Sequence, residues 1–321
     1  MLRIALSLLV SLALVLPAHA QGTYPDHPLR IIVPFPPGGP ADVLARLAGD
    51  QLSQSFGQAV VVENKPGAGG NIGMELGAKA AADGYTLILA PVGNLTVSPY
   101  IYSRLPYDPQ RDFAPVTVLA AFPNILVVNA AVQAKSVRDL IALAKAKPGT
   151  LNFASPGNGS GAHLAGELLK RMAGVDLVHV PFNGVAPAMN AVLAGDVQIF
   201  FAQTSAALPQ LKSGRVVALG VASLKRIDAA PELPTLAESG LPGFDVTSWY
   251  SLVVPAGTPP DRVARIQTTL ARAFAKPEVR EKIAGLGAEP VADTPAEFAS
   301  LLQTESARWR QLAREANIHA D

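Results

Sequence analysis

Apolar strand-like runs alternate with alanine-rich, helix-like stretches along most of this chain, and this alternation constrains the fold more than any other feature. The strand-like runs are residues 29–35, 59–63, 85–90, 151–154, 177–182, 197–201 and 216–221. The helix-like stretches are residues 41–56, 74–82, 137–147, 164–173 and 186–194. Such alternation is typical of βαβ units, whose strands form a parallel sheet covered by helices. The sequence therefore predicts an α/β fold.

The alternation occurs twice and is interrupted by two extended runs, at residues 114–129 and 245–254. The second run is followed by helices rather than by further strands. Two such passages indicate that the chain leaves one lobe, builds a second and returns. We expect lobe 1 to comprise residues 21–120 and 251–321, and lobe 2 to comprise residues 121–250. Each lobe would be a mainly parallel sheet flanked by helices, with a ligand cleft between the lobes.

The first twenty residues have the pattern of a secretory signal peptide. Arg3 is followed by the apolar residues 4–16, and Ala18-His19-Ala20 matches the A-x-A cleavage pattern. The apolar run is shorter than the ~20 residues that a membrane-spanning helix needs. We expect cleavage after Ala20 and a periplasmic mature protein. The chain has no cysteine, so its core rather than disulfides must stabilise it.

The mature chain is expected to carry no net charge. The whole sequence has 26 basic and 25 acidic side chains, and the signal segment holds one basic residue, Arg3, which leaves 25 of each. A chain without a basic excess has no electrostatic reason to bind nucleic acid or an anionic membrane. We expect neither as a partner.

Three strand-to-helix junctions consist of small residues without Lys or Arg. They are Gly38-Gly39, residues 153–163 and residues 180–187. At the start of a helix, backbone N–H groups point outward with the positive end of the helix dipole behind them. The three turns therefore predict that a small carboxylate binds to backbone donors. All three follow strands, and ligands of open parallel sheets bind outside the carboxyl ends of the strands.

Two residues near these turns allow more than one role. Asp42 falls in the first turn of its helix, where it is expected to cap N–H groups rather than contact an anion. His163 falls in the first turn of a later helix, where the dipole disfavours its charged form. It would either donate from a neutral ring or face solvent.

Familiar catalytic patterns are missing from the sequence. It contains no G-x-S-x-G, no H-E-x-x-H and no P-loop, and its histidines lack the spacing of metal ligands. Residues 67–73 approach a dinucleotide fingerprint, but the third glycine falls one residue late. We expect no enzyme, no catalytic residue, no metal and no cofactor. A hydrolase or isomerase that uses Ser155 or His163 stays as an alternative.

Six segments resemble the Bug receptors, which are the extracytoplasmic solute receptors of tripartite tricarboxylate transporters. The matching segments are residues 33–42 (VPFPPGGPAD), 63–71 (ENKPGAGGN), 83–87 (DGYTL), 151–160 (LNFASPGNGS), 180–182 (VPF) and 255–259 (PAGTP). The resemblance extends, in order, over essentially the whole mature chain. The chain departs from the family at Ala202, where Asp is usual, and at Val185, where Gly or Ser is common.

The resemblance implies a two-lobed periplasmic binding protein, type II-like, that closes on a carboxylate. It also implies delivery to a membrane permease with one large and one small subunit. A sensor ectodomain is the alternative partner, and we expect a monomer. The backbone and hydroxyl groups of Gly38, Gly39, Ser155, Gly159 and Ser160 would donate to the ligand, and Phe35 and Phe182 would wall its apolar body. The full set of expected ligand-binding residues is Phe35, Gly38, Gly39, Asp42, Asn94, Ser155, Asn158, Gly159, Ser160, His163, Phe182, Asn183 and Thr204.

Overall fold

The computed structural model describes residues 24–315 and 318–320, and the expected signal peptide lies outside this range. The strands are β1 (Leu29–Val33), β2 (Val60–Asn64), β3 (Thr86–Pro91), β4 (Phe113–Asn129), β5 (Asn152–Ser155), β6 (Val178–Pro181), β7 (Ile199–Gln203), β8 (Val216–Val221), β9 (Thr247–Pro255) and β10 (Glu289–Pro290). The helices are α2 (Pro40–Phe56), the short 3-10 turn η1 (Ala68–Gly70), α3 (Asn71–Ala78), α4 (Val92–Thr96), α5 (Ser98–Ile101), α6 (Val137–Ala146), α7 (Gly161–Ala173), α8 (Val185–Ala194), α9 (Thr204–Leu211), α10 (Pro260–Phe274), α11 (Pro277–Gly285) and α12 (Pro295–Glu315). None of the described helices is both long and apolar enough to cross a bilayer.

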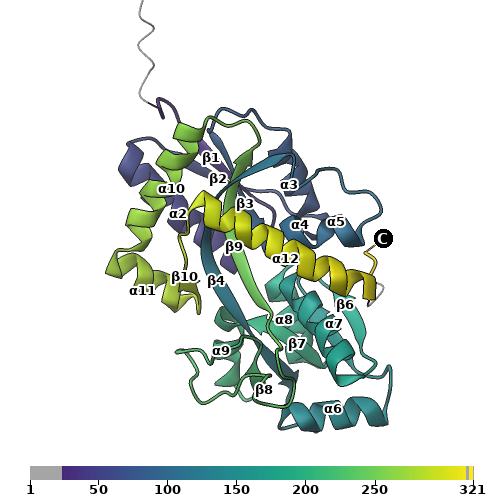
Figure 1. The fold of residues 1–321 in the computed structure, drawn as a ribbon. Helices are drawn as coiled ribbons and strands as arrows, with labels where there is room; N and C mark the ends of the chain where they lie inside the picture. Colours follow the sequence, from purple (N-terminus) through teal and green to yellow (C-terminus); the bar gives the residue numbers. More distant parts are fainter. Residues whose placement is uncertain (1–23, 316–317, 321) are drawn as a thin grey trace, which may run out of the picture.

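Two parallel segments lie at opposite ends of the sheet (Figure 1). Strands β2, β1 and β3 are parallel in one segment, and β6, β5 and β7 are parallel in the other. Between them lie β9 and β4, which run antiparallel to their neighbours, so the strand order is β2-β1-β3-β9-β4-β7-β5-β6. The predicted α/β fold with parallel strands and covering helices is confirmed.

The long strand β4 belongs to both ends of the sheet. Its residues 113–123 pair with β9, whereas residues 124–129 pair with β7 on one side and β8 on the other. Because β7 and β8 both run antiparallel to β4, they run in the same direction as each other. The unit β7-α9-β8 therefore keeps the direction of a βαβ unit, with β4 inserted between its strands.

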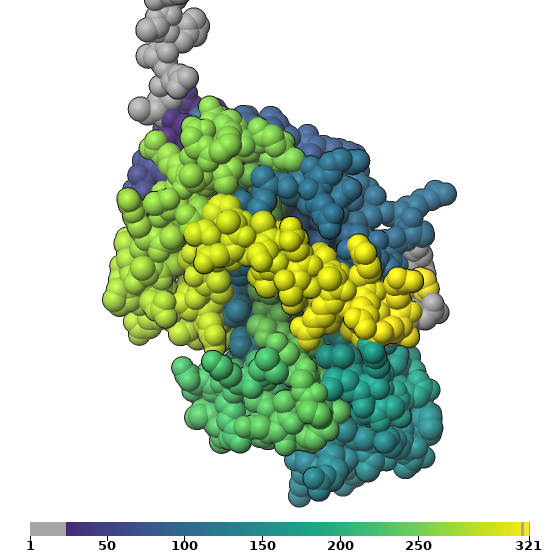
Figure 2. All heavy atoms as spheres, in the orientation of Figure 1, coloured from purple at the N-terminus to yellow at the C-terminus, as the bar shows by residue number. Residues whose placement is uncertain are grey.

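The described residues form three hydrophobic clusters, and the last helix contributes side chains to two of them. One core packs α2, α10 and α11 against β1, β3 and the first part of β4. The larger core packs α6 to α9 against β5, β7, β8 and the rest of β4, and it includes Trp309 and Leu312 of α12. Phe298, nearer the start of α12, instead packs against Trp249 of β9. Figure 2 shows α12 lying across the front of the molecule, over both parts.

The predicted elements agree with the structure except at some ends. Helix α3 begins at Asn71 rather than at residue 74, because the 3-10 turn η1 leads directly into it. It stops at Ala78, before the turn at Gly84, where a left-handed backbone (φ +80°) ends the segment. The expected lobe boundaries near residues 120 and 250 fall inside β4 and β9, and they stay a prediction.

Candidate functional site

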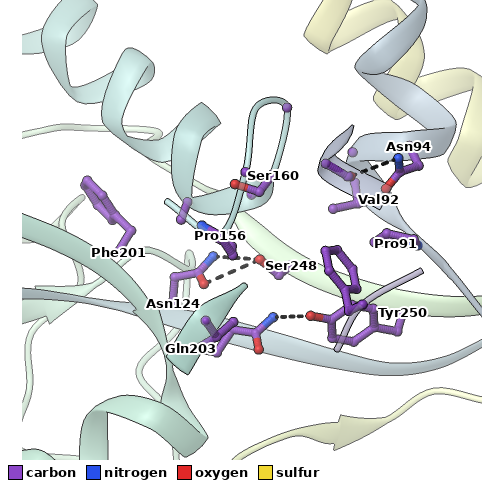
Figure 3. A pocket seen from close by; sticks show the side chains of 18 of the residues that line it. Pro91, Val92, Asn94, Asn124, Pro156, Ser160, Phe201, Gln203, Ser248 and Tyr250 are labelled. Atoms are coloured by element: carbon purple, nitrogen blue, oxygen red, sulfur yellow. Dashed lines mark hydrogen bonds between the residues drawn. The ribbon is translucent and has the colours of Figure 1, made fainter. Parts of the chain in front are cut away.

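A hollow lies at the carboxyl ends of β3, β5 and β7, between the two ends of the sheet (Figure 3). Its volume is about 530 Å³ when counted out to open solvent. We call it the main hollow. It is lined by Phe35, Gly69, Pro91, Val92, Gly93, Asn94, Asn124, Pro156, Gly157, Asn158, Gly159, Ser160, Gly161, Ala162, Val185, Phe200, Phe201, Gln203, Ser248, Trp249 and Tyr250. None of these described lining residues is acidic or basic.

Helix α7 directs its N-terminus at the main hollow. Ser160 caps the helix, since its Oγ accepts a hydrogen bond from the His163 N–H at 3.3 Å. Gly161 and Ala162 occupy the first two helical positions, where N–H groups have no acceptor inside the helix. The first turn of α7 contains no acidic side chain. The positive end of the helix dipole therefore faces the hollow without a counter-charge, which favours an anionic ligand.

Polar side chains from the two crossing strands form the floor beside this helix end. Asn124 on β4 donates from Nδ2 to Ser248 Oγ on β9 at 3.1 Å, and Figure 3 shows both side chains facing the turn at Ser160. Gly161 lies so close to Ser248 that an added methyl group would overlap its Oγ. Only glycine at this position lets α7 reach the crossing strands.

Gln203 and Tyr250 continue the floor. Gln203 Nε2 donates to Tyr250 Oη at 3.0 Å, and Gln203 Oε1 is buried without a partner among the described residues. A buried acceptor of this kind is commonly satisfied by an ordered water or a ligand. Burial raises the pKa of Tyr250 to about 12, so the phenol keeps its proton and adds no charge to the hollow.

The opposite wall comes from α4 and η1. Asn94 is 3% exposed, and its Nδ2 donates to Asn71 Oδ1 at 2.8 Å and to Gly69 O at 3.2 Å. A methyl group at Gly93 would overlap the carbonyl oxygen of Gly159, so backbone meets backbone across the hollow. This contact places the two walls in a closed arrangement.

A second, mainly apolar hollow adjoins the first, and the two share Phe35, Pro156, Val185 and Tyr250. Gly39 and Asn183 line only this second hollow. Val185, one of the two departures from the family pattern, therefore lies on the wall common to both. Ala202, the other departure, is fully buried and lines neither.

The structure brings some predicted residues together and separates others. Phe35, Asn94, Asn158, Gly159 and Ser160 line the main hollow, and their contact with a ligand stays a prediction. Phe182 lines neither hollow; it packs against the larger core. Thr204 is buried, donates from Oγ1 to Pro123 O at 2.7 Å and lines neither hollow in this arrangement.

The N–H of Gly38, a predicted donor, already has an acceptor within the protein. It donates to Asp42 Oδ2 at 3.0 Å, so a ligand finds this group occupied. Asp42 is held by a bidentate contact with Arg46 and by Asn64 Nδ2 at 2.9 Å. Asp42 therefore caps the turn, as its position in the helix indicates, and does not line either hollow.

The backbone donors of the second turn are likewise partly occupied. Gly159 N–H donates to His163 Nδ1 at 3.0 Å, and Ser160 N–H donates to Gly157 O at 3.2 Å. Ser155 is fully buried, and its Oγ accepts from Gly157 N–H at 3.2 Å and lies 2.7 Å from His179 Nε2. The N–H groups of Gly159 and Ser160 and the hydroxyl of Ser155 are therefore already engaged within the protein, whereas donation from the Ser160 hydroxyl to a ligand stays a prediction. The N–H groups without an acceptor inside the helix are those of the next two residues, Gly161 and Ala162.

His163 does not face solvent. It is 3% exposed and lies behind the turn rather than in the hollow. Its Nδ1 accepts a hydrogen bond from Gly159 N–H, which fits the expected neutral ring, whereas the expected alternative of a solvent-facing ring is wrong.

The residues that sequence reasoning missed come mostly from the crossing strands. Asn124 and Ser248 are polar residues at strand positions that are otherwise mainly apolar, and this was the available signal. Among the described residues, no group of three or more His, Asp or Glu side chains is arranged to hold a metal ion.

The C-terminal segment connects both walls of the main hollow. Ala320 N–H donates to Ile101 O at 3.0 Å, at the end of α5, the helix that follows α4 of one wall. Ala320 O accepts from Asn158 Nδ2 at 3.3 Å, in the opposite turn. The side chain of Asn158 is thus tied to the end of the chain.

Comparisons with known proteins agree with this geometry. Residues 44–318 match the model of a family described as tripartite tricarboxylate transporter family receptor. Protein BugT of Bordetella pertussis is 38% identical over 294 residues, which cover 91% of this chain and 90% of BugT. Two solved structures from Rhodopseudomonas palustris are similar: Rpa4515 with adipate (36% identity, TM-score 0.88, 92% of this chain and 99% of that one) and MatC with bound malate (34%, 0.84, 90% and 99%).

Proposed function

This chain belongs to the tripartite tricarboxylate transporter receptor family, and from that premise we propose that it captures a small organic carboxylate in the main hollow. The protein would act in the periplasm after loss of residues 1–20. It would then deliver the ligand to the large and small permease subunits of a tripartite transporter. The resemblance to Bug receptors predicted from the sequence is confirmed by the family match.

One observation carries the assignment to a carboxylate. The N-terminus of α7 opens onto a hollow whose described lining holds no charged side chain, and the first turn of that helix has no acid of its own. A carboxylate placed there would accept from the N–H groups of Gly161 and Ala162 and would face the positive end of the dipole. The adipate and malate in the two related structures are carboxylates too, which supports the same ligand class here.

The two hollows together suit a carboxylate with an apolar body. The second hollow has five proline residues in its wall, Pro36, Pro37, Pro40, Pro156 and Pro187, and proline has no N–H to donate. The head group would lie at α7, and the aliphatic or aromatic remainder would lie against Phe35 and Val185 on the shared wall.

The expected lobes explain how such a ligand enters. We propose that residues 21–120 with 251–321, and residues 121–250, move as two bodies about the crossings of β4 and β9. Closure would bring Gly93 against Gly159 and cover the ligand. The unfavourable part of the binding free energy would then come mainly from closing the lobes, because the donors at α7 are already in place.

Isothermal titration calorimetry of the mature protein tests this function. The panel should contain hexanoate, benzoate, adipate and malate, with hexanamide as an uncharged match for hexanoate. We expect at least one carboxylate to bind and the amide to fail, since only an anion gains from the helix dipole. A folded protein that binds no carboxylate, after copurified ligand has been removed by unfolding and refolding, would contradict the proposal.

A further inference from the structure

Two buried imidazole rings lie directly behind the turn that lines the main hollow. His163 of α7 and His179 of β6 stack face to face, with ring centroids 3.9 Å apart and planes 10° apart. Phe153 of β5 lies against the ring of His179 at 4.9 Å. Neither histidine lines a hollow, so neither contacts a ligand in this arrangement.

The ring of His163 holds one glycine of the turn. Gly159 N–H lies 3.0 Å from His163 Nδ1, and because a backbone N–H can only donate, Nδ1 must be the unprotonated nitrogen. The proton of the neutral ring is then on Nε2, which lies 3.9 Å from Glu167 Oε1. Glu167 is itself paired with Lys170 Nζ at 2.9 Å.

The ring of His179 holds the other end of the same turn. Its Nε2 lies 2.7 Å from Ser155 Oγ, and this oxygen accepts from Gly157 N–H at 3.2 Å. The two rings therefore brace Gly157 and Gly159, which both line the main hollow.

We propose that His163 and His179 are positioning residues of the carboxylate site: as a neutral stacked pair they hold residues 157–160 in place, and a proton on His163 releases the turn and the ligand. This inference rests on the proposed function. A proton on Nδ1 would face the Gly159 N–H, so two donors would oppose each other and the turn would have to move. Because the Gly159 carbonyl packs against Gly93, that movement reaches the opposite wall.

The charges around the pair set the direction of the pH dependence. Burial lowers the pKa of His163 well below its ordinary value, and His179 and Lys170 lower it further. Burial also lowers the pKa of His179 to about 4. Glu167 is the acidic group facing Nε2, and its pairing with Lys170 limits its pull. The closed form binds fewer protons, so affinity is full at neutral pH and falls as the pH drops below the ordinary imidazole range.

Substitutions at His163 test the role. In His163→Asn the side-chain oxygen can accept from Gly159 N–H but cannot titrate, whereas His163→Leu fills similar space without an acceptor. We expect His163→Asn to bind a carboxylate within about threefold of the wild type at neutral pH. His163→Leu should bind about tenfold more weakly, because one hydrogen bond is lost.

Between pH 7 and pH 5 the wild type should lose affinity relative to His163→Asn. Comparing the two proteins at the same pH cancels the effect of the ligand's own titration. The exposed His27→Asn is the matched control and should follow the wild type.

Parallel pH profiles for the wild type and His163→Asn would overturn the proposal, even if His163→Leu does not fold. A second readout needs no ligand: in the free wild type, nitrogen NMR should show His163 protonated on Nε2. The protection of the Gly159 amide against solvent exchange, relative to the intrinsic base-catalysed rate at each pH, should decrease as the pH falls. An Nδ1-protonated ring would also overturn it. If no carboxylate binds but the NMR results are as expected, the proposed function fails and the bracing of the turn stands.

Discussion

The two glycine turns at Gly38-Gly39 and at Gly157–Gly161 look alike in sequence, but the structure uses them differently. Each follows a parallel strand and precedes a helix, and neither contains a basic residue. At the start of α2, Asp42 accepts the Gly38 N–H and lies close to the positive end of the helix. At the start of α7 there is no acid, and the first N–H groups face the main hollow.

The difference shows what makes such a turn an anion site. Glycine lets a ligand approach the backbone, but an acid within the first helical turn already supplies the negative charge that the dipole favours. The turn at α2 is therefore a closed structural cap, whereas the turn at α7 leaves its donors for a ligand. The comparison can be tested by placing an acid at the start of α7 or by removing the acid at the start of α2.

The largest effect is expected from an acid placed at the start of α7. Ala162→Asp would supply the helix end with its own carboxylate and bring a like charge against the ligand. We expect carboxylate affinity to fall by at least about a hundredfold, or about 3 kcal/mol. Calorimetry should be paired with thermal melting, because Ala162 is buried. Ala162→Asn has the same shape without the charge, and an equal loss in both variants would show that crowding, not charge, is responsible.

The reverse change at α2 should affect folding instead of binding. Asp42→Asn removes a buried carboxylate that accepts from Gly38, Asn64 and Arg46. We expect the free energy of unfolding to fall by about 1–2 kcal/mol, as for the loss of charged hydrogen bonds, with ligand affinity changed less than about twofold. Urea denaturation and calorimetry on the same preparation measure both. A larger change in affinity than in stability would mean that the turn at Gly38 does bind the ligand.

The stabilising effect of Asp42 should also depend on pH. Burial raises the pKa of Asp42, but hydrogen bonds from Arg46, Gly38 and Asn64 outweigh it and hold the pKa below its ordinary value of 3.8. The carboxylate therefore stabilises the fold above pH 3.8, and this contribution is lost as the pH falls through the lower folded-state value. The urea midpoints of the wild type and Asp42→Asn should differ at neutral pH and converge in acid. A gap that does not narrow as the pH falls below 3.8 would contradict this account.

The smallest effect is expected from salt. The site binds through backbone dipoles and has no basic side chain in its described lining, so screening should change little. Between roughly 50 mM and 500 mM sodium chloride, affinity should vary by less than about twofold. A steep decline would indicate that a basic residue outside the hollow, such as Arg46, contacts the ligand.

Much of the fold and about half of the site follow from sequence. Apolar runs and small-residue turns locate the strands and place the α7 turn at the carboxyl edge of the sheet. They do not show which backbone donors are already occupied, because Asp42 and His163 fill them only once the helices have formed. The end of β7 also separates two neighbouring residues: Gln203, the last residue of β7, lines the hollow, whereas Thr204, the first residue of α9, donates to Pro123 O.

The crossing strands were harder to interpret. Asn124 and Ser248 come from runs that are buried on both faces, so alternation does not indicate which side chains face a ligand. Their meeting depends on the antiparallel pairing of β4 with β9, which joins segments more than a hundred residues apart. Local sequence patterns carry no information about that register.

The hydrogen bonds of Ala320 have a practical consequence for anyone who prepares this protein. A peptide fused to the carboxyl end of the chain would pull on the backbone that holds both Ile101 and Asn158. A label attached next to Tyr24, which packs against Tyr85 and lines neither hollow, would leave these hydrogen bonds untouched.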